Sequence, residues 1–239
     1  MKKLLPVLAT LLLVGCGIPS VHPLYEYDDL ITNENLTGVW KKSNSSTTWH
    51  VIQISELENW VATHDSTSEN RLRLTRQLDL DESKFSGEIT ASGQVVNEIG
   101  IDLSENPSAK NLYLLQKQGG ENELFLAGLL QINGNYYFDL YQLYFDTEQF
   151  RFPVHIFMKA SIRQDELELH YFDESWLQEL ISNRQVRIKH EVNRDGNVLL
   201  TASTRDLQRF VEKYGDIDEA YRDNDVMQRI SSTPVFIFE

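Results

Sequence analysis

Cysteine is almost absent from this sequence, which has one, Cys16, in 239 residues. A single cysteine forms no disulfide within the chain, and metal sites built from several cysteines are excluded by the same count. The fold must therefore rest on a hydrophobic core. A chain of this length buries enough surface to form such a core without covalent cross-links.

Basic residues and long hydrophobic runs are also scarce. The chain has 22 lysines and arginines against 36 aspartates and glutamates, a formal net charge of −14. This balance argues against a nucleic-acid partner, whose phosphates require basic patches, and against electrostatic adhesion to anionic lipid. The longest apolar stretch, residues 4–14, is well short of the roughly 20 residues that a membrane-spanning helix needs.

Motifs of the common catalytic sites are missing as well. The sequence has no Walker-type loop, no G-x-S-x-G and no H-E-x-x-H. Its six histidines are scattered singly, at positions 22, 50, 64, 155, 170 and 190. We therefore predict no metal site and no cofactor.

The N-terminus has the pattern of an export signal. Lys2 and Lys3 precede the short apolar run, and small residues follow it, which is typical of a secretory signal peptide over residues 1–15. The residues Leu13-Val14-Gly15-Cys16 then resemble the bacterial lipobox. An ordinary secretory signal with a chance cysteine is the alternative.

The lipobox resemblance implies a role for the lone cysteine. In lipoproteins the signal peptidase cuts just before the cysteine after its thiol has taken a diacylglycerol, so Cys16 becomes the lipidation site and the membrane becomes a partner. The next residue is Gly17, and not the aspartate that retains lipoproteins in the inner membrane of enteric-type bacteria. The resemblance therefore implies a location on the periplasmic face of the outer membrane.

Residues 16–35 have the composition of a tether. Pro19 and Pro23 block a helix and favour extended backbone. The second half of the segment is too apolar for a purely solvated linker, so we expect it to pack onto the domain.

From residue 36 the sequence is dominated by period-two alternation, which indicates half-buried strands. The strongest hairpin signal is Asn133-Gly134 between two apolar runs, and a second turn is expected at Asp195-Gly196. About ten to twelve short strands at regular spacing predict an antiparallel meander that forms a barrel or a sandwich. Residues 36–239 are interpreted as one mainly β (α+β) domain with a helical subregion from about residue 173.

Two helices are expected in that subregion. Residues 173–181 place apolar side chains at helical spacing and acids in the first turn. Residues 203–215 begin with Ser203 and Asp206 in a capping-box-like pattern, carry one apolar stripe and end at Gly215. We expect both helices to pack on the β-structure, with Phe210 buried.

Gly38 and Trp40 form a G-x-W pattern at the start of the first expected strand. It resembles the lipocalin signature, and this resemblance implies an eight-stranded up-and-down barrel whose bottom is closed by the tryptophan. More loosely, residues 22–25 and 200–204 resemble bacterial lipoproteins of unassigned function, a similarity that implies no activity.

Three residues are candidates for ligand binding: Trp40, Asp139 and His155. Asp139 alternates with tyrosines, and His155 lies on the polar, basic side of its expected strand. We expect a non-catalytic binding or scaffold module for a small hydrophobic ligand or an envelope protein. The alternative is a periplasmic hydrolase whose site is assembled around His155. The sequence also leaves two alternatives for the inside of the β-structure: an apolar cavity that takes the ligand, or a filled core that the helices cover.

Overall fold

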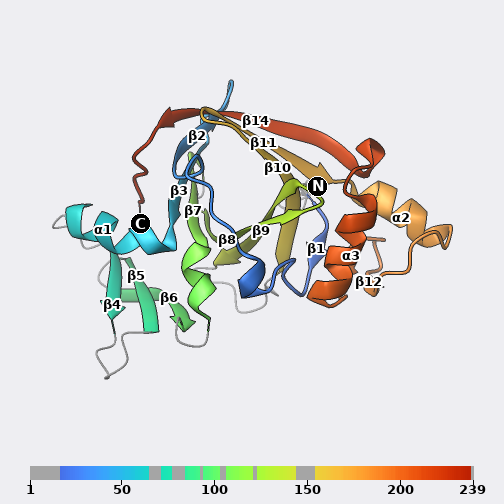
Figure 1. The fold of residues 1–239 in the computed structure, drawn as a ribbon, viewed down its shortest axis with the longest axis horizontal. Coiled ribbons are helices and arrows are strands. Elements are labelled where there is room, and N and C mark those ends of the chain that lie inside the picture. The colour runs from blue at the N-terminus through green and yellow to red at the C-terminus, as the bar shows by residue number, and fades with distance from the viewer. Residues whose placement is uncertain are drawn as a thin grey trace, which may run out of the picture.

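Eight antiparallel strands close into a barrel at the centre of the protein (Figure 1). The computed structural model describes residues 17–64, 71–76, 84–91, 94–102, 106–120, 123–143 and 154–237. Residues 1–16, which contain the expected signal segment and Cys16, lie outside these ranges. The barrel strands are β2 (Gly38–Lys42), β3 (Thr48–Gln53), β7 (Tyr113–Gln118), β8 (Glu123–Ile132), β9 (Asn135–Leu143), β10 (His155–Ile162), β11 (Glu166–Phe172) and β14 (Tyr221–Ser231).

The barrel is a closed meander. Each of its strands pairs with the next one along the chain, and the last strand, β14, pairs with the first, β2. Closure removes the free edges that an open sheet would expose. The expected mainly β fold is confirmed, and of the two expected architectures the protein has the barrel.

Two insertions interrupt the meander and flank the barrel (Figure 1). Between β3 and β7 the chain forms α1 (Ile54–His64), the separate antiparallel sheet β4 (Arg71–Arg76), β5 (Lys84–Ala91) and β6 (Gln94–Asp102), and the short 3-10 helix η2 (Pro107–Asn111). Between β11 and β14 it forms α2 (Glu174–Ser182), β12 (His190–Val192), β13 (Val198–Leu200), α3 (Thr204–Tyr214) and η3 (Asp218–Ala220).

The first helix, α1, was not expected, because residues 59–64 were interpreted as part of the period-two region; that interpretation is wrong. Ile54 and Leu57 are three residues apart, which is helical spacing, and both are buried. Trp60, one further turn along, contacts Phe236 edge to face and donates its indole N–H to Pro234. These contacts fix a helical face against the C-terminal segment.

The expected turn between β8 and β9 is confirmed. Asn133 and Gly134 both have positive φ angles, 51° and 83°. Two successive residues with positive φ make the turn whose twist matches the twist of the flanking strands. The tight connection explains why β8 and β9 stay paired from Ile132–Asn135 to Leu124–Leu143.

Alternation along the barrel strands creates two separate cores. The inner core fills the barrel and contains Leu36, Trp40, Val51, Tyr113, Leu115, Ala127, Leu129, Phe138, Leu140, Met158, Ala160, Leu167, Leu169, Tyr171 and Met227. The outer core lies between the barrel wall and the segments that cover it, and includes residues such as Leu130, Phe157 and Phe172. Strands β8 and β9 carry apolar residues on both faces because both faces are buried.

The two expected C-terminal helices are present on the outer core. In α2, Asp173 is the N-cap and its carboxylate accepts from the Ser175 N–H at 2.8 Å. In α3, the Ser203 hydroxyl caps the Asp206 N–H at 3.3 Å. The apolar stripe of α3 is buried, and Phe210 is 4% exposed.

The N-terminal segment packs on the barrel from its first described residue. Gly17 and Ile18 are buried, and the short strand β1 (Pro19–Ser20) pairs with β10 and with β13. Leu24, Tyr25 and Leu30 are also buried around the 3-10 helix η1 (Tyr27–Asp29). The second half therefore packs as expected. The first half belongs to the folded domain as well, because the residues of β1 pair with both β10 and β13.

The C-terminal segment is held by a buried histidine. The Val235 N–H donates to His50 Nδ1 at 3.0 Å, and His50 Nε2 lies 3.0 Å from the Thr48 hydroxyl. Nδ1 can accept this hydrogen bond only when the imidazole is neutral. Burial lowers the pKa of His50 below its ordinary value of 6.5, which favours the same neutral form.

We expect this arrangement to make stability fall on acidification. Below about pH 6.5 the unfolded chain takes up a proton at His50 that the folded chain resists, so the free energy of unfolding decreases as the pH falls. Urea melts above and below pH 6.5 measure the free energy of unfolding at each pH. The comparison is His50→Gln, because glutamine has no titratable side chain. If the difference between wild type and His50→Gln is the same at both pH values, the explanation is wrong.

Candidate functional site

The inside of the barrel is apolar and rich in aromatic residues. Besides the buried inner core, six partly exposed hydrophobic side chains line it: Ile31, Trp49, Phe125, Tyr136, Ile156 and Ile162. Tyr113 and Phe138 lie together with ring centroids 6.5 Å apart. Each of the eight barrel strands contributes at least one side chain to this interior, so apolar groups surround it on every side.

One end of the barrel, the Trp40 end, is closed. The Trp40 side chain is fully buried, and its indole N–H donates to the Leu36 carbonyl at 2.9 Å. The chain before β2 crosses this end, with the Ile31 N–H donating to the Leu129 carbonyl at 2.9 Å. Leu36 belongs to the inner core and Ile31 packs against it, so this preceding segment is part of the packing of the closed end.

Arg229 holds the Trp40 ring and the neighbouring loops together at this closed end. Its guanidinium lies 4.5 Å from the centre of the Trp40 ring and donates to the carbonyls of Thr37, at 2.6 Å, and of Asn35. Its Nε donates to the Gln164 carbonyl at 2.8 Å. The flat, multiply donating guanidinium is suited to stacking on a ring while bonding several carbonyls. Trp40 therefore lies at the closed end of an eight-stranded barrel, while the resemblance of Gly38 and Trp40 to the lipocalin signature stays a prediction.

The opposite end, named the Trp49 end, is polar. Trp49 pairs directly with Trp40 across β2 and β3, so the two indoles are neighbours, and Trp49 lies on the side toward this end. This end lies at the turns between β2 and β3 and between β7 and β8, where Lys117 ion-pairs with Glu123 at 2.6 Å. Strand alternation places both side chains on the inward face, next to Leu115 and Phe125. Across the barrel, Lys42 pairs with Asp225, which also accepts from the Tyr171 hydroxyl at 3.1 Å.

The Trp49 end therefore combines apolar and charged side chains. Trp49, Phe125 and Ile156 lie on the inward faces of their strands and are partly exposed. Pockets for small molecules have this composition, in which apolar walls bind the ligand and a few polar groups orient it.

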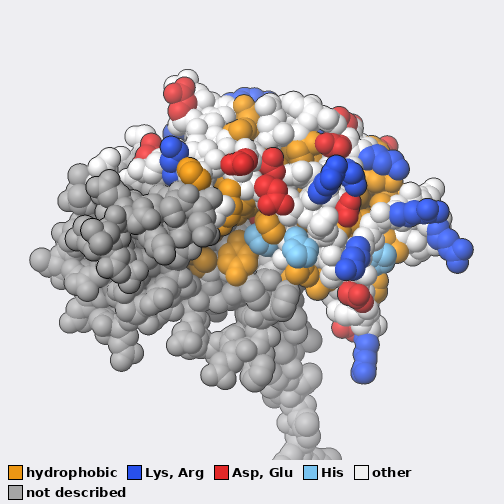
Figure 2. All heavy atoms as spheres, turned by 60° about the horizontal axis from the view of Figure 1, so that its bottom comes forward, with side chains coloured by type: hydrophobic (Ala, Val, Ile, Leu, Met, Phe, Trp, Pro, Cys, Tyr) orange, Lys and Arg blue, Asp and Glu red, His pale blue; other side chains and the backbone are white. Residues whose placement is uncertain are grey.

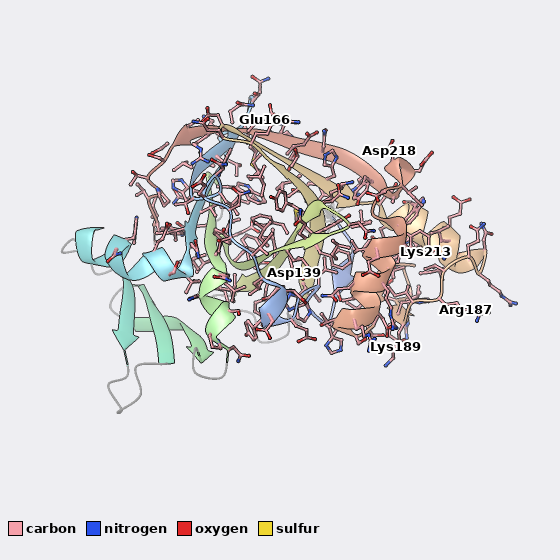
Figure 3. The ribbon with its side chains drawn as sticks, in the orientation of Figure 1. Asp139, Glu166, Arg187, Lys189, Lys213 and Asp218 are labelled. Carbon is pink, nitrogen blue, oxygen red and sulfur yellow. The ribbon has the colours of Figure 1, made fainter. Side chains whose placement is uncertain are left out.

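Asp139 and His155 lie together, but on the outer wall of the barrel. Asp139 Oδ1 is 2.6 Å from His155 Nδ1, and Oδ2 accepts from the Leu24 N–H at 2.6 Å. The Asp139 side chain is fully buried and that of His155 is 13% exposed. The Tyr141 ring packs against the imidazole, with 4.9 Å between the two ring centres. Figure 3 shows Asp139 beside the N-terminal segment that covers it.

The N-terminal segment covers this pair tightly. Gly128, on the outer face of β8, leaves room for Tyr25: a Cβ at position 128 would lie 2.5 Å from the Tyr25 ring. Burial and the nearby Asp139 carboxylate raise the pKa of the Tyr25 hydroxyl, so it stays protonated at neutral pH. Asp139 thus holds the segment to the wall through Oδ2, while its Oδ1 bonds His155 of the neighbouring strand β10.

The three candidate residues do not form one site. Asp139 and His155 meet outside the barrel, whereas Trp40 lies in its inner core. The Ser20 hydroxyl, on the strand paired with His155, donates to the His22 carbonyl at 2.8 Å and so is directed away from the imidazole. In the part of the chain that the structure describes, no serine, threonine or cysteine is hydrogen-bonded to His155.

Sequence reasoning did not find Arg229 or the ion pairs of the Trp49 end. Within residues 17–64, 71–76 and the other described ranges, no group of three or more His, Cys, Asp or Glu side chains could hold a metal ion. None of the helices in these ranges is long and apolar enough to cross a membrane. No family model, curated protein or solved structure matches the chain.

Proposed function

We propose that this protein is an envelope lipoprotein whose barrel is a non-catalytic module that binds a small hydrophobic ligand at the Trp49 end. The observation that carries the proposal is the closed barrel with an apolar interior, shut at one end by Trp40 and Arg229 and bearing partly exposed Trp49 and Phe125 at the other. A ligand that covers such side chains gains about 25 cal/mol for each Å² of apolar surface removed from water.

Attachment to the outer membrane through lipidated Cys16, on the periplasmic face, is part of the same proposal. Its support is the Leu13-Val14-Gly15-Cys16 sequence after a short apolar run, together with the absence of aspartate at position 17. An anchored carrier has access to the lipids of the membrane that holds it. No nucleic-acid partner is proposed, because the chain is strongly acidic overall.

Tryptophan fluorescence tests the location of the ligand. The Cys16→Ala chain is titrated with a fluorescent apolar probe and with fatty acids. We expect saturable quenching that becomes much weaker in Trp49→Phe, because Trp49 is partly exposed toward the proposed entrance, whereas its cross-strand neighbour Trp40 is fully buried. The matched control Trp176→Phe changes a tryptophan on α2, outside the barrel, and should keep the quenching.

Two results would contradict the carrier function. One is the absence of saturable binding, which would leave the barrel as a scaffold for an envelope protein. The outer face of β14 supports that second role, since Val226 and Ile230 are 37% and 56% exposed there. The other is quenching that persists in Trp49→Phe and disappears in Trp176→Phe, which would place the ligand on the helices.

A hydrolase is the second candidate, and the Asp139–His155 contact favours it. A carboxylate that accepts from Nδ1 orients an imidazole so that Nε2 can act as a base. The test is ester hydrolysis by the full chain, compared with His155→Gln. Turnover that His155→Gln abolishes would support a hydrolase, and equal rates for the two chains would exclude this site.

A further inference from the structure

A basic groove lies at the far end of the molecule from α1, between residues 184–189 and α3. Its volume is about 560 Å³, which is the size of a small-molecule pocket. It is lined by Arg184, Gln185, Val186, Arg187, Ile188, Lys189, Asp206, Arg209, Phe210, Lys213 and Tyr214. Figure 2 shows lysine and arginine side chains projecting at the end of the molecule that carries α2 and α3, and Figure 3 places Arg187, Lys189 and Lys213 there.

The two walls of the groove are positively charged. One wall presents three cations, Arg184, Arg187 and Lys189, and the other presents Arg209 and Lys213 from α3. Asp206 is the one acidic residue in the lining, and it pairs with Arg209 at 3.1 Å. The lining therefore has an excess of four positive charges in a chain whose net charge is −14.

Three of these cations have no counter-charge. Among the described residues, the side chains of Arg184, Arg187 and Lys189 make no hydrogen bond and no ion pair. Lys213 lies over the Tyr214 ring, 4.8 Å from its centre, and does not pair with an acid. Like charges that line one groove repel each other, and Asp206 is the only acid in that lining. The lining of the groove is therefore positively charged in a chain that is acidic overall.

The backbone holds the groove in place. The Gln185 N–H donates to the Leu180 carbonyl at 2.8 Å, and the Gln185 carbonyl accepts from the Tyr214 hydroxyl at 3.3 Å. At the other end of the loop, the Lys189 carbonyl accepts from the Thr201 N–H at 2.9 Å. The backbone of the loop that carries these three cations is thus fixed to α2, to α3 and to Thr201 directly after β13, so little backbone ordering is needed before a ligand binds.

The floor of the groove is apolar. Phe210, Tyr214 and Ile188 lie at its base and are 4%, 9% and 8% exposed. A ligand with charged groups at its ends and a less polar centre fits such a surface, since the charges reach the two walls while the centre covers the floor.

We propose that this groove binds a small molecule or headgroup that carries two phosphate groups. A phosphate monoester has a charge of about −1.5 to −2 at neutral pH, so two of them balance the four excess positive charges. Arginine binds phosphate oxygens with paired N–H groups, and three of the five cations are arginines. The volume is far larger than one phosphate needs. This inference does not depend on the barrel ligand or on Cys16.

The source of the phosphates is either a free metabolite or a membrane lipid. The groove lies next to the small β1–β13–β12 strand group, because Lys189 immediately precedes β12. A lipid anchor at Cys16 would enter the domain at β1. A membrane-borne headgroup is therefore as accessible as a soluble ligand, and the test has one arm for each.

Titration calorimetry of the full chain with pyrophosphate, inorganic phosphate and chloride as probes tests the free source. We expect pyrophosphate to bind more tightly than phosphate, and to bind at least about tenfold more weakly to the double variant Arg187→Glu/Lys213→Glu, which reverses one charge on each wall. The matched control is Arg205→Glu, an exposed arginine of the same helix that does not line the groove. It should keep the wild-type affinity.

Vesicle flotation tests the membrane source. The Cys16→Ala chain and its groove variant are compared on phosphatidylcholine vesicles with and without a lipid that carries two phosphates, such as cardiolipin. Cardiolipin-dependent flotation that the groove variant loses supports the proposal with a lipid headgroup as the ligand. If the groove variant changes neither pyrophosphate affinity nor flotation, or if wild type binds neither probe, the proposal is overturned. Circular dichroism melts confirm that each variant is folded.

Discussion

Phe210→Ala should lower the free energy of unfolding by about 3–5 kcal/mol, the range for removing a buried phenylalanine ring. Phe210 projects from α3 into the outer core, where its ring centre lies 5.1 Å from that of Tyr214, 5.9 Å from that of Phe172 and 6.3 Å from that of Trp176. One side chain thus joins α2, α3 and the barrel wall. These aromatic neighbours belong to the outer core or pack against it, so alanine would leave a cavity among them.

Denaturant melts of the full chain measure this effect, and Ile230→Ala is the control. Ile230 is 56% exposed on β14, so its truncation should change stability by less than about 0.5 kcal/mol. A loss below about 1 kcal/mol for Phe210→Ala would mean that α3 does not stay docked on the barrel. Such a result would also remove the floor of the basic groove.

The strands and helices could be read from the sequence because their signals are local. Alternation sets the faces of a strand, and the Asn133-Gly134 turn and the Ser203 cap each depend on a few adjacent residues. Closure of the barrel could not be read in this way. It depends on pairing between β14 and β2, where Arg229 lies opposite Trp40, and no local pattern encodes a contact across so much sequence.

Helix α1 was missed for a related reason. Its segment is short, and Ile54 and Leu57, three residues apart, are too small a helical signal to stand out directly after the alternation of β3. Trp60 and Phe236 decide between the two, and their contact joins the first insertion to the C-terminus. Tertiary packing, and not local preference, selects the helix here.

The candidate site residues also could not be assembled from the sequence, because their contacts join different strands. The alternation of β10 predicted a polar, basic face for His155, but in the barrel that face is covered and includes the buried Phe157. The contact between Asp139 and His155 also requires the register in which Asp139 lies opposite Phe157. Trp40 was grouped with them because inside and outside of a closed sheet are not distinguishable from one strand. The basic groove could not be predicted from the sequence for another reason. Arg187 and Lys213 belong to different segments of the chain, and the net charge of −14 counts them together with acids that do not line the groove.

Cys16→Ala should move the protein from the membrane fraction to the soluble fraction. One acyl chain gives only marginal attachment, whereas the two or three chains of this lipoprotein class hold almost permanently, since each buried methylene contributes roughly 0.8 kcal/mol. Removing the thiol removes every chain at once. The measurement is cell fractionation combined with labelling by a fatty-acid analogue.

The folded domain should be unaffected by this change, because its packing begins after Cys16. Gly17 is buried and Pro19–Ser20 pair with β10 and β13, so the variant should unfold at the same denaturant concentration as wild type. The same packing leaves almost no free chain between the anchor and the barrel: three residues from Cys16 to β1 span at most about 10 Å. We therefore expect the barrel to be held against the bilayer and not displaced from it on a tether. Wild-type protein that is soluble and carries no label would refute the anchor, and a Cys16→Ala chain that stays in the membrane fraction would assign attachment to another part of the molecule.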